Sequence, residues 1–111
     1  MNDDAFFSEQ STILKALTGA LIEATPESWR DFTLTLEVAE DGCSHTIFCE
    51  EHPDDFVGAT TEIFQASGRL RDLFVRRSEP WKRATIRVWQ TPEGKWKFKG
   101  TYDYERTGVK R

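Results

Sequence analysis

Four potential metal ligands lie within ten residues of one another, at Cys43, His45, Cys49 and His52. Thiolate and imidazole groups are the ligands that structural zinc prefers in proteins. Structural zinc sites usually draw on closely paired ligands such as Cys-x2-Cys. Here the two cysteines are six residues apart on what reads as one strand, a separation of roughly 20 Å. We therefore predict ordinary strand cysteines, with no zinc site and no disulfide between them.

Catalytic chemistry is weakly represented in the chain. An acid–base or nucleophilic site usually needs a histidine beside a nucleophile, or two carboxylates held in a cleft. The sequence has two histidines, and its adjacent acids, such as Asp54 and Asp55, are typical of a solvated surface. It contains no glycine-rich phosphate loop and no dinucleotide-binding motif. We predict that the protein is not an enzyme and that it uses no cofactor.

Charge divides the chain into two halves. Residues 1–55 contain 13 acidic and 2 basic residues, for a net charge of −11, whereas residues 56–111 contain 6 acidic and 13 basic residues, for a net charge of +7. The acidic half ends in the run Glu50-Glu51-His52-Pro53-Asp54-Asp55. A surface of this kind favours the capture of a basic partner.

The basic half alternates cations with aromatic rings, an arrangement that can hold single-stranded nucleic acid. On the last predicted strand, however, Trp96, Phe98 and Tyr102 have the opposite parity to Lys97 and Lys99. The rings then belong to a core beneath the helices, and the lysines belong to a solvated face. Nucleic-acid binding through this hairpin is therefore the alternative interpretation, and capture of a basic protein is the leading one.

Size and composition indicate one globular domain over residues 1–111, since 38% of the residues are hydrophobic and 13% are aromatic. The first residues, Met1-Asn2-Asp3-Asp4, are acidic where a secretory signal would be basic. No apolar run approaches the roughly 18 residues that span a bilayer. We expect a cytoplasmic protein that does not contact a membrane, in a compartment that keeps thiols reduced.

Hydrophobic spacing predicts two helices and four strands, because apolar residues recur every three or four positions in the helices and every second position in the strands. The predicted helices cover 4–24 and 59–77, and the predicted strands cover 29–39, 43–50, 82–90 and 96–103. The order α-β-β-α-β-β defines an α+β fold in which a four-stranded antiparallel sheet packs on two helices.

Two turns join the predicted strands into hairpins. Asp41-Gly42 is suited to the centre of a type I′ turn, which needs positive φ at both central positions. Thr91-Pro92-Glu93-Gly94 has proline early and glycine late, as hairpin turns prefer. Across the resulting sheet, Glu37 could lie near basic residues of the second hairpin, namely Arg87, Lys97 or Lys99, so part of the charge separation is expected to be neutralised internally.

Several segments resemble the YezG-like immunity (antitoxin) family of bacterial toxin–immunity systems. The stretch 26–38, which begins Pro26-Glu27-Ser28-Trp29, resembles the family's Pro-x-x-Trp entry into a strand. The second helix, Trp81 and the closing stretch 94–105, which begins Gly94-Lys95-Trp96, are similar to the rest of the pattern. The resemblance covers about residues 10–105.

The resemblance implies a cytoplasmic immunity protein that binds and neutralises a cognate toxin by occlusion, often a nuclease with a basic surface, and that has no catalytic site of its own. From the charge of the first half we predict that its acidic contacts are Glu40, Asp41, Glu50, Glu51, Asp54 and Asp55. A second candidate surface gathers two acids with two amphipathic rings of the kind enriched at interfaces, at Tyr102, Asp103, Tyr104 and Glu105. Tyr102 could equally pack in the core. The oligomeric state is left open.

Overall fold

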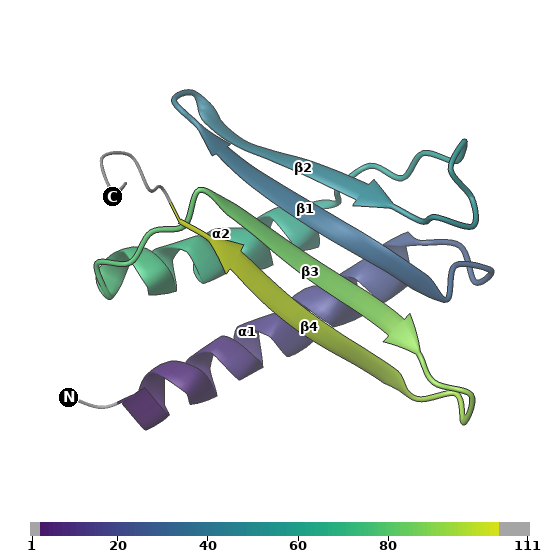
Figure 1. Cartoon of the computed structure of the whole chain (residues 1–111), viewed down its shortest axis with the longest axis horizontal. Helices are drawn as coiled ribbons and strands as arrows, with labels where there is room; N and C mark the ends of the chain where they lie inside the picture. Colours follow the sequence, from purple (N-terminus) through teal and green to yellow (C-terminus); the bar gives the residue numbers. More distant parts are fainter. Residues whose placement is uncertain (1–2, 105–111) are drawn as a thin grey trace, which may run out of the picture.

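The computed structural model describes residues 3–104 of the chain. Its elements, in chain order, are α1 (Asp3–Ala24), β1 (Asp31–Ala39), β2 (Gly42–Phe48), α2 (Thr61–Arg76), β3 (Arg83–Gln90) and β4 (Trp96–Asp103). The strands form one antiparallel sheet in the order β2-β1-β3-β4, and both helices lie behind the same face of it (Figure 1). The predicted α+β fold and element order are confirmed, and each element begins and ends within two residues of its predicted bounds.

The core lies between the helices and the sheet. Alternate residues of the two central strands are buried, and they pack against buried residues of both helices. The buried strand residues are Phe32, Leu34, Leu36, Ala84, Ile86 and Val88. Each fully buried large apolar side chain contributes about 1.5–3 kcal/mol relative to its exposed state. The residues between them, such as Thr33 and Thr85, face the other side of the sheet, which we call the open face.

The turn between β1 and β2 differs from the prediction. Ala39 pairs with Gly42, so the two turn residues are Glu40 and Asp41 rather than Asp41 and Gly42. Among residues 3–104 only Ser78, Gly42 and Gly94 have positive φ, and the φ of Gly42 is 144°. The type I′ prediction was therefore wrong, because the strand register moves the turn back by one residue and places the glycine at the start of β2.

The turn between β3 and β4 agrees with the prediction. The amide of Gly94 donates to the carbonyl of Thr91 at 2.8 Å, and the φ of Gly94 is 88°, in the region that favours glycine. The N-terminus of α2 is capped by Thr60, whose side chain accepts a hydrogen bond from the amide of Ile63 at 3.3 Å. This cap ends the long connection that follows β2.

Neither of the helices described is both long enough and apolar enough to cross a membrane.

The chain repeats an αββ unit with an offset of 52 residues. At this offset Trp29 corresponds to Trp81, and both are buried just before a central strand. The two glycines with positive φ, Gly42 and Gly94, also correspond. So do two backbone hydrogen bonds that join β1 and β3: Val38 N–H to Lys82 C=O at 2.9 Å, and Gln90 N–H to Arg30 C=O at 2.8 Å. The antiparallel pair of β1 and β3 thus lies on a pseudo-two-fold axis that relates the two halves.

Candidate functional site

Part of the charge that the sequence separates is neutralised between the two halves. Arg87 of β3 makes two hydrogen bonds to the carboxylate of Asp31 on β1, at 3.0 and 2.7 Å. These bonds raise the pKa of Arg87. Arg83 of β3 binds Glu37 of β1, with Nε to Oε2 at 3.0 Å. Glu37 therefore lies against Arg83 and not against Arg87, Lys97 or Lys99 as expected, because the register places it directly opposite Arg83.

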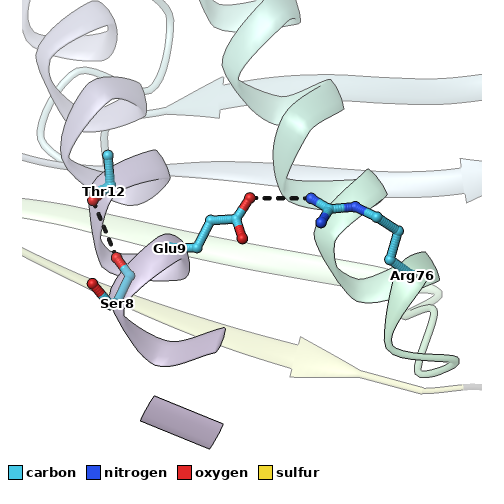
Figure 2. Close-up of polar contacts among 4 residues, drawn as sticks. All are labelled: Ser8, Glu9, Thr12 and Arg76. Atoms are coloured by element: carbon cyan, nitrogen blue, oxygen red, sulfur yellow. Dashed lines mark hydrogen bonds and ion pairs between the residues drawn. The ribbon is translucent and has the colours of Figure 1, made fainter. Parts of the chain in front are cut away.

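The helices are joined in the same way. Glu9 points from the N-terminal part of α1 toward Arg76 at the end of α2, and Nη2 of Arg76 lies 3.1 Å from Oε2 of Glu9 (Figure 2). One turn along α1, the Thr12 hydroxyl donates to the carbonyl of Ser8 at 3.1 Å (Figure 2). The three ion pairs Asp31–Arg87, Glu37–Arg83 and Glu9–Arg76 therefore each take the acid from the first half and the arginine from the second.

The acidic loop, residues 50–55, differs from the three acids of the first half that pair with arginines. Glu50, Glu51 and Asp54 are exposed, and none of them makes an ion pair with another residue in the range 3–104. Asp55 lies 3.9 Å from Nδ1 of His52. The loop thus holds acidic charge that forms no ion pair with described residues outside the loop.

The backbone of this loop is fixed to the core. His52 N–H donates to Cys49 C=O at 3.0 Å, and Asp55 N–H donates to His52 C=O at 3.1 Å. The imidazole of His52 stacks on buried Trp29, with ring centroids 6.4 Å apart and planes 11° apart. Beyond the loop, Val57 forms an antiparallel bridge with Ile47 of β2. A loop held in this way loses little conformational entropy when a partner binds it.

Two exposed phenylalanines flank the acidic loop. Phe48 ends β2 with 47% of its surface exposed, and Phe56 follows Asp55 with 90% exposed. Phe48 lines an open pocket of about 360 Å³ together with residues of the loop and of the open face. The lining residues are Asp31, Thr33, Phe48, Glu50, Glu51 and Arg87. We call the set Phe48, Glu50, Glu51, Asp54 and Phe56 the acidic–aromatic surface.

The two phenylalanines were not among the residues predicted to bind a partner, although the sequence contained a signal for one of them. Phe48 has the same parity as Ser44 and Thr46, so strand alternation places all three on the wet face. A large aromatic side chain at a wet position, directly before an acidic run, is the pattern that could have found it. Phe56 lies in a loop, where no periodicity tells which way a side chain points.

The structure separates the predicted acidic contacts into two places. Glu40 and Asp41 lie at the turn between β1 and β2, whereas the acidic loop lies at the other end of this hairpin, about 20 Å away by strand length. Asp103 and Tyr104 lie near the turn end, since Asp103 pairs with Arg83 and Arg83 pairs with Glu37. Glu40 and Asp41 are therefore closer to this second candidate surface than to the acidic loop.

The second candidate surface is less available than the sequence suggested. Tyr102 is half-buried, its hydroxyl donates to Oε1 of Gln10 at 2.9 Å, and its ring lies 4.6 Å from that of Phe74. Burial raises the pKa of Tyr102 to about 12. The structure thus supports core packing for Tyr102 and leaves Asp103 and the partly exposed Tyr104 at this place. Glu105 lies outside the described residues.

The cysteines and histidines are distributed among different surroundings. Cys49 is buried and Cys43 is half-buried, and both are free thiols. The Nδ1 of His45 lies 3.2 Å from the carbonyl of Cys43, and Nε2 lies 2.7 Å from the hydroxyl of Ser67 on α2. Within residues 3–104, no three His, Cys, Asp or Glu side chains are grouped so that they could hold a metal ion.

The neutral form of His45 accounts for both of its contacts. A carbonyl oxygen only accepts, so Nδ1 carries the hydrogen. In the neutral ring Nε2 then accepts from the Ser67 hydroxyl at 2.7 Å, in competition with the carbonyl of Phe64, which lies 3.1 Å from the same hydroxyl. Burial lowers the pKa of His45, which favours this neutral form. His45 therefore joins β2 to α2 as a structural residue.

The basic hairpin has the parity that the sequence predicted. Trp96, Phe98 and Tyr102 are partly buried against the core, whereas Lys97 and Lys99 are exposed on the open face. The ring on the lysine side is that of Trp89, which is half-buried and lies 4.6 Å from the guanidinium carbon of Arg87.

No protein-family model matches this chain, and no curated protein matches it. The resemblance to the YezG-like family therefore stays a prediction from the segments that carry it.

Proposed function

We propose that this protein is an immunity protein that binds and neutralises a cognate bacterial toxin by occluding it. The observation that carries the proposal is the acidic–aromatic surface, where two exposed phenylalanines flank acids that make no ion pair with another residue in the range 3–104. The resemblance to the YezG-like family supports the same class of function. The toxin that fits best is a basic nuclease domain, because a surface built to hold phosphates is complementary to carboxylates.

The two kinds of side chain have separate roles in this proposal. Aromatic anchors at the centre of an interface carry much of the binding free energy, because they are fully desolvated in the complex. Carboxylates around them accelerate the encounter with a cationic partner and select against other partners. Phe56, at 90% exposure, is the most exposed large hydrophobic residue within 3–104, so it is the proposed anchor.

The first experiment is growth rescue in cells that express the toxin candidate encoded beside this gene, followed by co-purification of the two proteins. Rescue with a one-to-one complex supports the proposal. Failure of rescue against a toxin shown to be active rejects that pairing.

The binding surface is then tested with variants of the complex. The pair Glu50→Lys with Glu51→Lys should slow association and weaken its dependence on salt, whereas Phe56→Ala should mainly speed dissociation. Glu93→Lys, in the exposed turn between β3 and β4, is the matched charge control and should leave both rates near those of the natural protein. If the control has the same effect as the loop variants, only the net charge matters and the surface is misassigned.

One observation favours the alternative of nucleic-acid binding. Lys97, Lys99 and Trp89 share the open face, and neither lysine makes an ion pair with a residue in the described range. A single half-buried ring beside two cations is a small platform for stacking. Binding to single-stranded RNA at low salt that disappears with Lys97→Glu and Lys99→Glu, but not with Lys15→Glu, would establish this function. No binding at low salt would reject it.

A further inference from the structure

The two outer edges of the sheet differ. On the β2 side, the bridge from Val57 to Ile47 occupies part of the edge. On the β4 side, no residue within 3–104 bridges to the outer edge, and β4 pairs regularly with β3 over all eight of its residues, from Trp96 to Asp103. A regular edge strand of this length has unpaired backbone groups that can add another strand.

The hydrogen bonds of the hairpin show which backbone groups of β4 point outward. Thr91 N–H donates to Lys95 C=O at 2.7 Å, so these two residues form a hydrogen-bonded pair. Hydrogen-bonded pairs alternate along an antiparallel ladder, so Lys97, Lys99, Thr101 and Asp103 use their N–H and C=O groups toward β3. The residues with outward N–H and C=O groups are Trp96, Phe98, Gly100 and Tyr102.

We propose that β4 pairs in an antiparallel manner with β4 of a second copy of this chain, about a two-fold axis at Gly100. Gly100 then forms a hydrogen-bonded pair with Gly100 of the second copy, as its outward N–H and C=O groups require. On the open face, Lys97 of each copy lies opposite Asp103 of the other, which gives two opposite-charge pairs. On the helix side, Phe98 lies opposite Tyr102, a pairing of two rings. Cross-strand pairs of both kinds stabilise antiparallel sheets.

The charges of β4 select this register. An axis at Lys99 would place Lys99 opposite itself, and an axis at Phe98 would place Lys97 opposite Lys99 twice. An axis at Thr101 would pair Lys99 with Asp103 and would place Lys97 opposite position 105, which is beyond the end of β4 and outside the described residues. Among the axes within β4, the one at Gly100 pairs Lys97 with the acid of the strand itself, Asp103, and avoids like-charge pairs throughout the strand. The lysines thus oppose slipped pairing, as edge lysines commonly do.

Glycine suits the position on the axis because it has no side chain. The need for glycine at this position, however, comes from a contact within a single copy. A Cβ atom at this residue would lie 2.9 Å from the hydroxyl of Tyr102.

The dimer would be an eight-stranded sheet with the helices of both copies on one face. Because β2 is at the opposite edge from β4, the two acidic–aromatic surfaces would lie at the outer margins and stay accessible. The inference goes beyond the proposed function and does not depend on it.

Sedimentation equilibrium of the full chain over a wide concentration range tests the dimer. We expect a monomer–dimer equilibrium in the natural protein, and a dissociation constant raised about tenfold by Lys97→Glu or by Asp103→Lys, since each places two like-charge pairs across the axis. Lys15→Glu on α1 is the matched charge control and should not change it. A protein that is monomeric at millimolar concentration, or a dimer that neither variant weakens, would overturn the proposal.

Mixing the two variants separates a changed interface from a damaged fold. An equimolar mixture of the Lys97→Glu and Asp103→Lys proteins restores both opposite-charge pairs, so it should form a heterodimer about as tight as the natural homodimer. Amide hydrogen exchange gives the register, since the amides of Phe98, Gly100 and Tyr102 should become protected as concentration rises, whereas that of Lys99 is already protected in the monomer. No heterodimer from folded variants, or no concentration dependence at these amides, would also overturn it.

Discussion

The two αββ halves of this protein share a framework and differ in their surfaces. Both have a buried tryptophan before the central strand and a glycine with positive φ in the hairpin. Yet Asp31 of the first half corresponds to Arg83 of the second at the offset of 52 residues. Exposed Phe48, which pairs with Thr33, has the place in its hairpin that Thr101, which pairs with Thr85, has in the other. Strand alternation and a few turn and core residues therefore specify the framework, whereas the outward-facing residues can differ and even carry opposite charges.

The difference in charge also stabilises the contact between the halves. Because β1 lies beside β3 and α1 beside α2, acids of the first half meet arginines of the second in three ion pairs. The charge separation in the sequence is therefore partly a property of the fold. The acidic loop takes no part in these pairs, and it has no equivalent within the described part of the second half.

Removal of the two equivalent tryptophans should have the largest effect. Trp29→Ala and Trp81→Ala each leave a large cavity, and each should lower the free energy of unfolding by about 3–5 kcal/mol in urea denaturation. Only Trp29→Ala should also speed amide exchange in the acidic loop, because His52 stacks on Trp29. Equal exchange in this loop for both variants would contradict the assigned role of the stack.

The two hairpin glycines should come next. Gly42→Ala and Gly94→Ala force a side chain into the positive-φ region, and each should lower the free energy of unfolding by about 1–2 kcal/mol. No atom lies within 4 Å of a Cβ built at Gly42, so the cost there comes from backbone strain alone. Gly68→Ala, in a helix with open space around it, is the control and should not destabilise the protein. An equal loss in the control would argue against strain.

The ion pairs between the halves should have smaller effects. A double-mutant cycle on Asp31 and Arg87 should give a favourable coupling free energy that decreases as salt is added, because the pair is exposed and bidentate. A cycle on Glu37 and Arg83 should behave alike, since both pairs join β1 to β3. Coupling that does not respond to salt would show that packing, and not charge, links the two strands.

The smallest expected effect is the pH dependence that His45 adds to the first half. Its pKa in the folded protein is below the ordinary value of 6.5, so the folded state binds fewer protons than the unfolded state as the pH falls. Its contribution to stability is therefore complete above pH 6.5 and is lost as the pH falls through the lower folded pKa. Urea denaturation between pH 5 and 7.5 should show this loss, and His45→Gln should remove it. An unchanged slope in the variant would assign the loss to other groups.

Local patterns were sufficient for most of the fold. The helices, the strands and the inward parity of Trp96 and Phe98 follow from periodicity, because burial of one face requires apolar residues at matching intervals. The turn at Asp41-Gly42 was predicted one residue too far along, since the register of β1 with β2 depends on the whole hairpin. Periodicity also contains no information on strand order, so it could not place β1 beside β3.

The candidate site was only partly predictable for the same reason. The sequence identified the acidic loop by composition, but it did not show which acids pair with arginines elsewhere in the chain. It named Tyr102 as a possible contact, and the structure packs this ring against Phe74. Side-chain partners that are distant in sequence are set by the packing of elements, which local spacing does not report.

By itself, the sequence determined the element order, the inward faces of the strands and the unequal charge of the two halves, because these depend on residue types and their local intervals. Only the tertiary structure decided that the halves are related by a pseudo-two-fold axis and that two acids of β1 pair with two arginines of β3. It also decided that Phe48 and Phe56 remain exposed beside acids that have no ion partner among residues 3–104. These properties arise from contacts between residues far apart in the chain, which exist only once the sheet and helices are packed together.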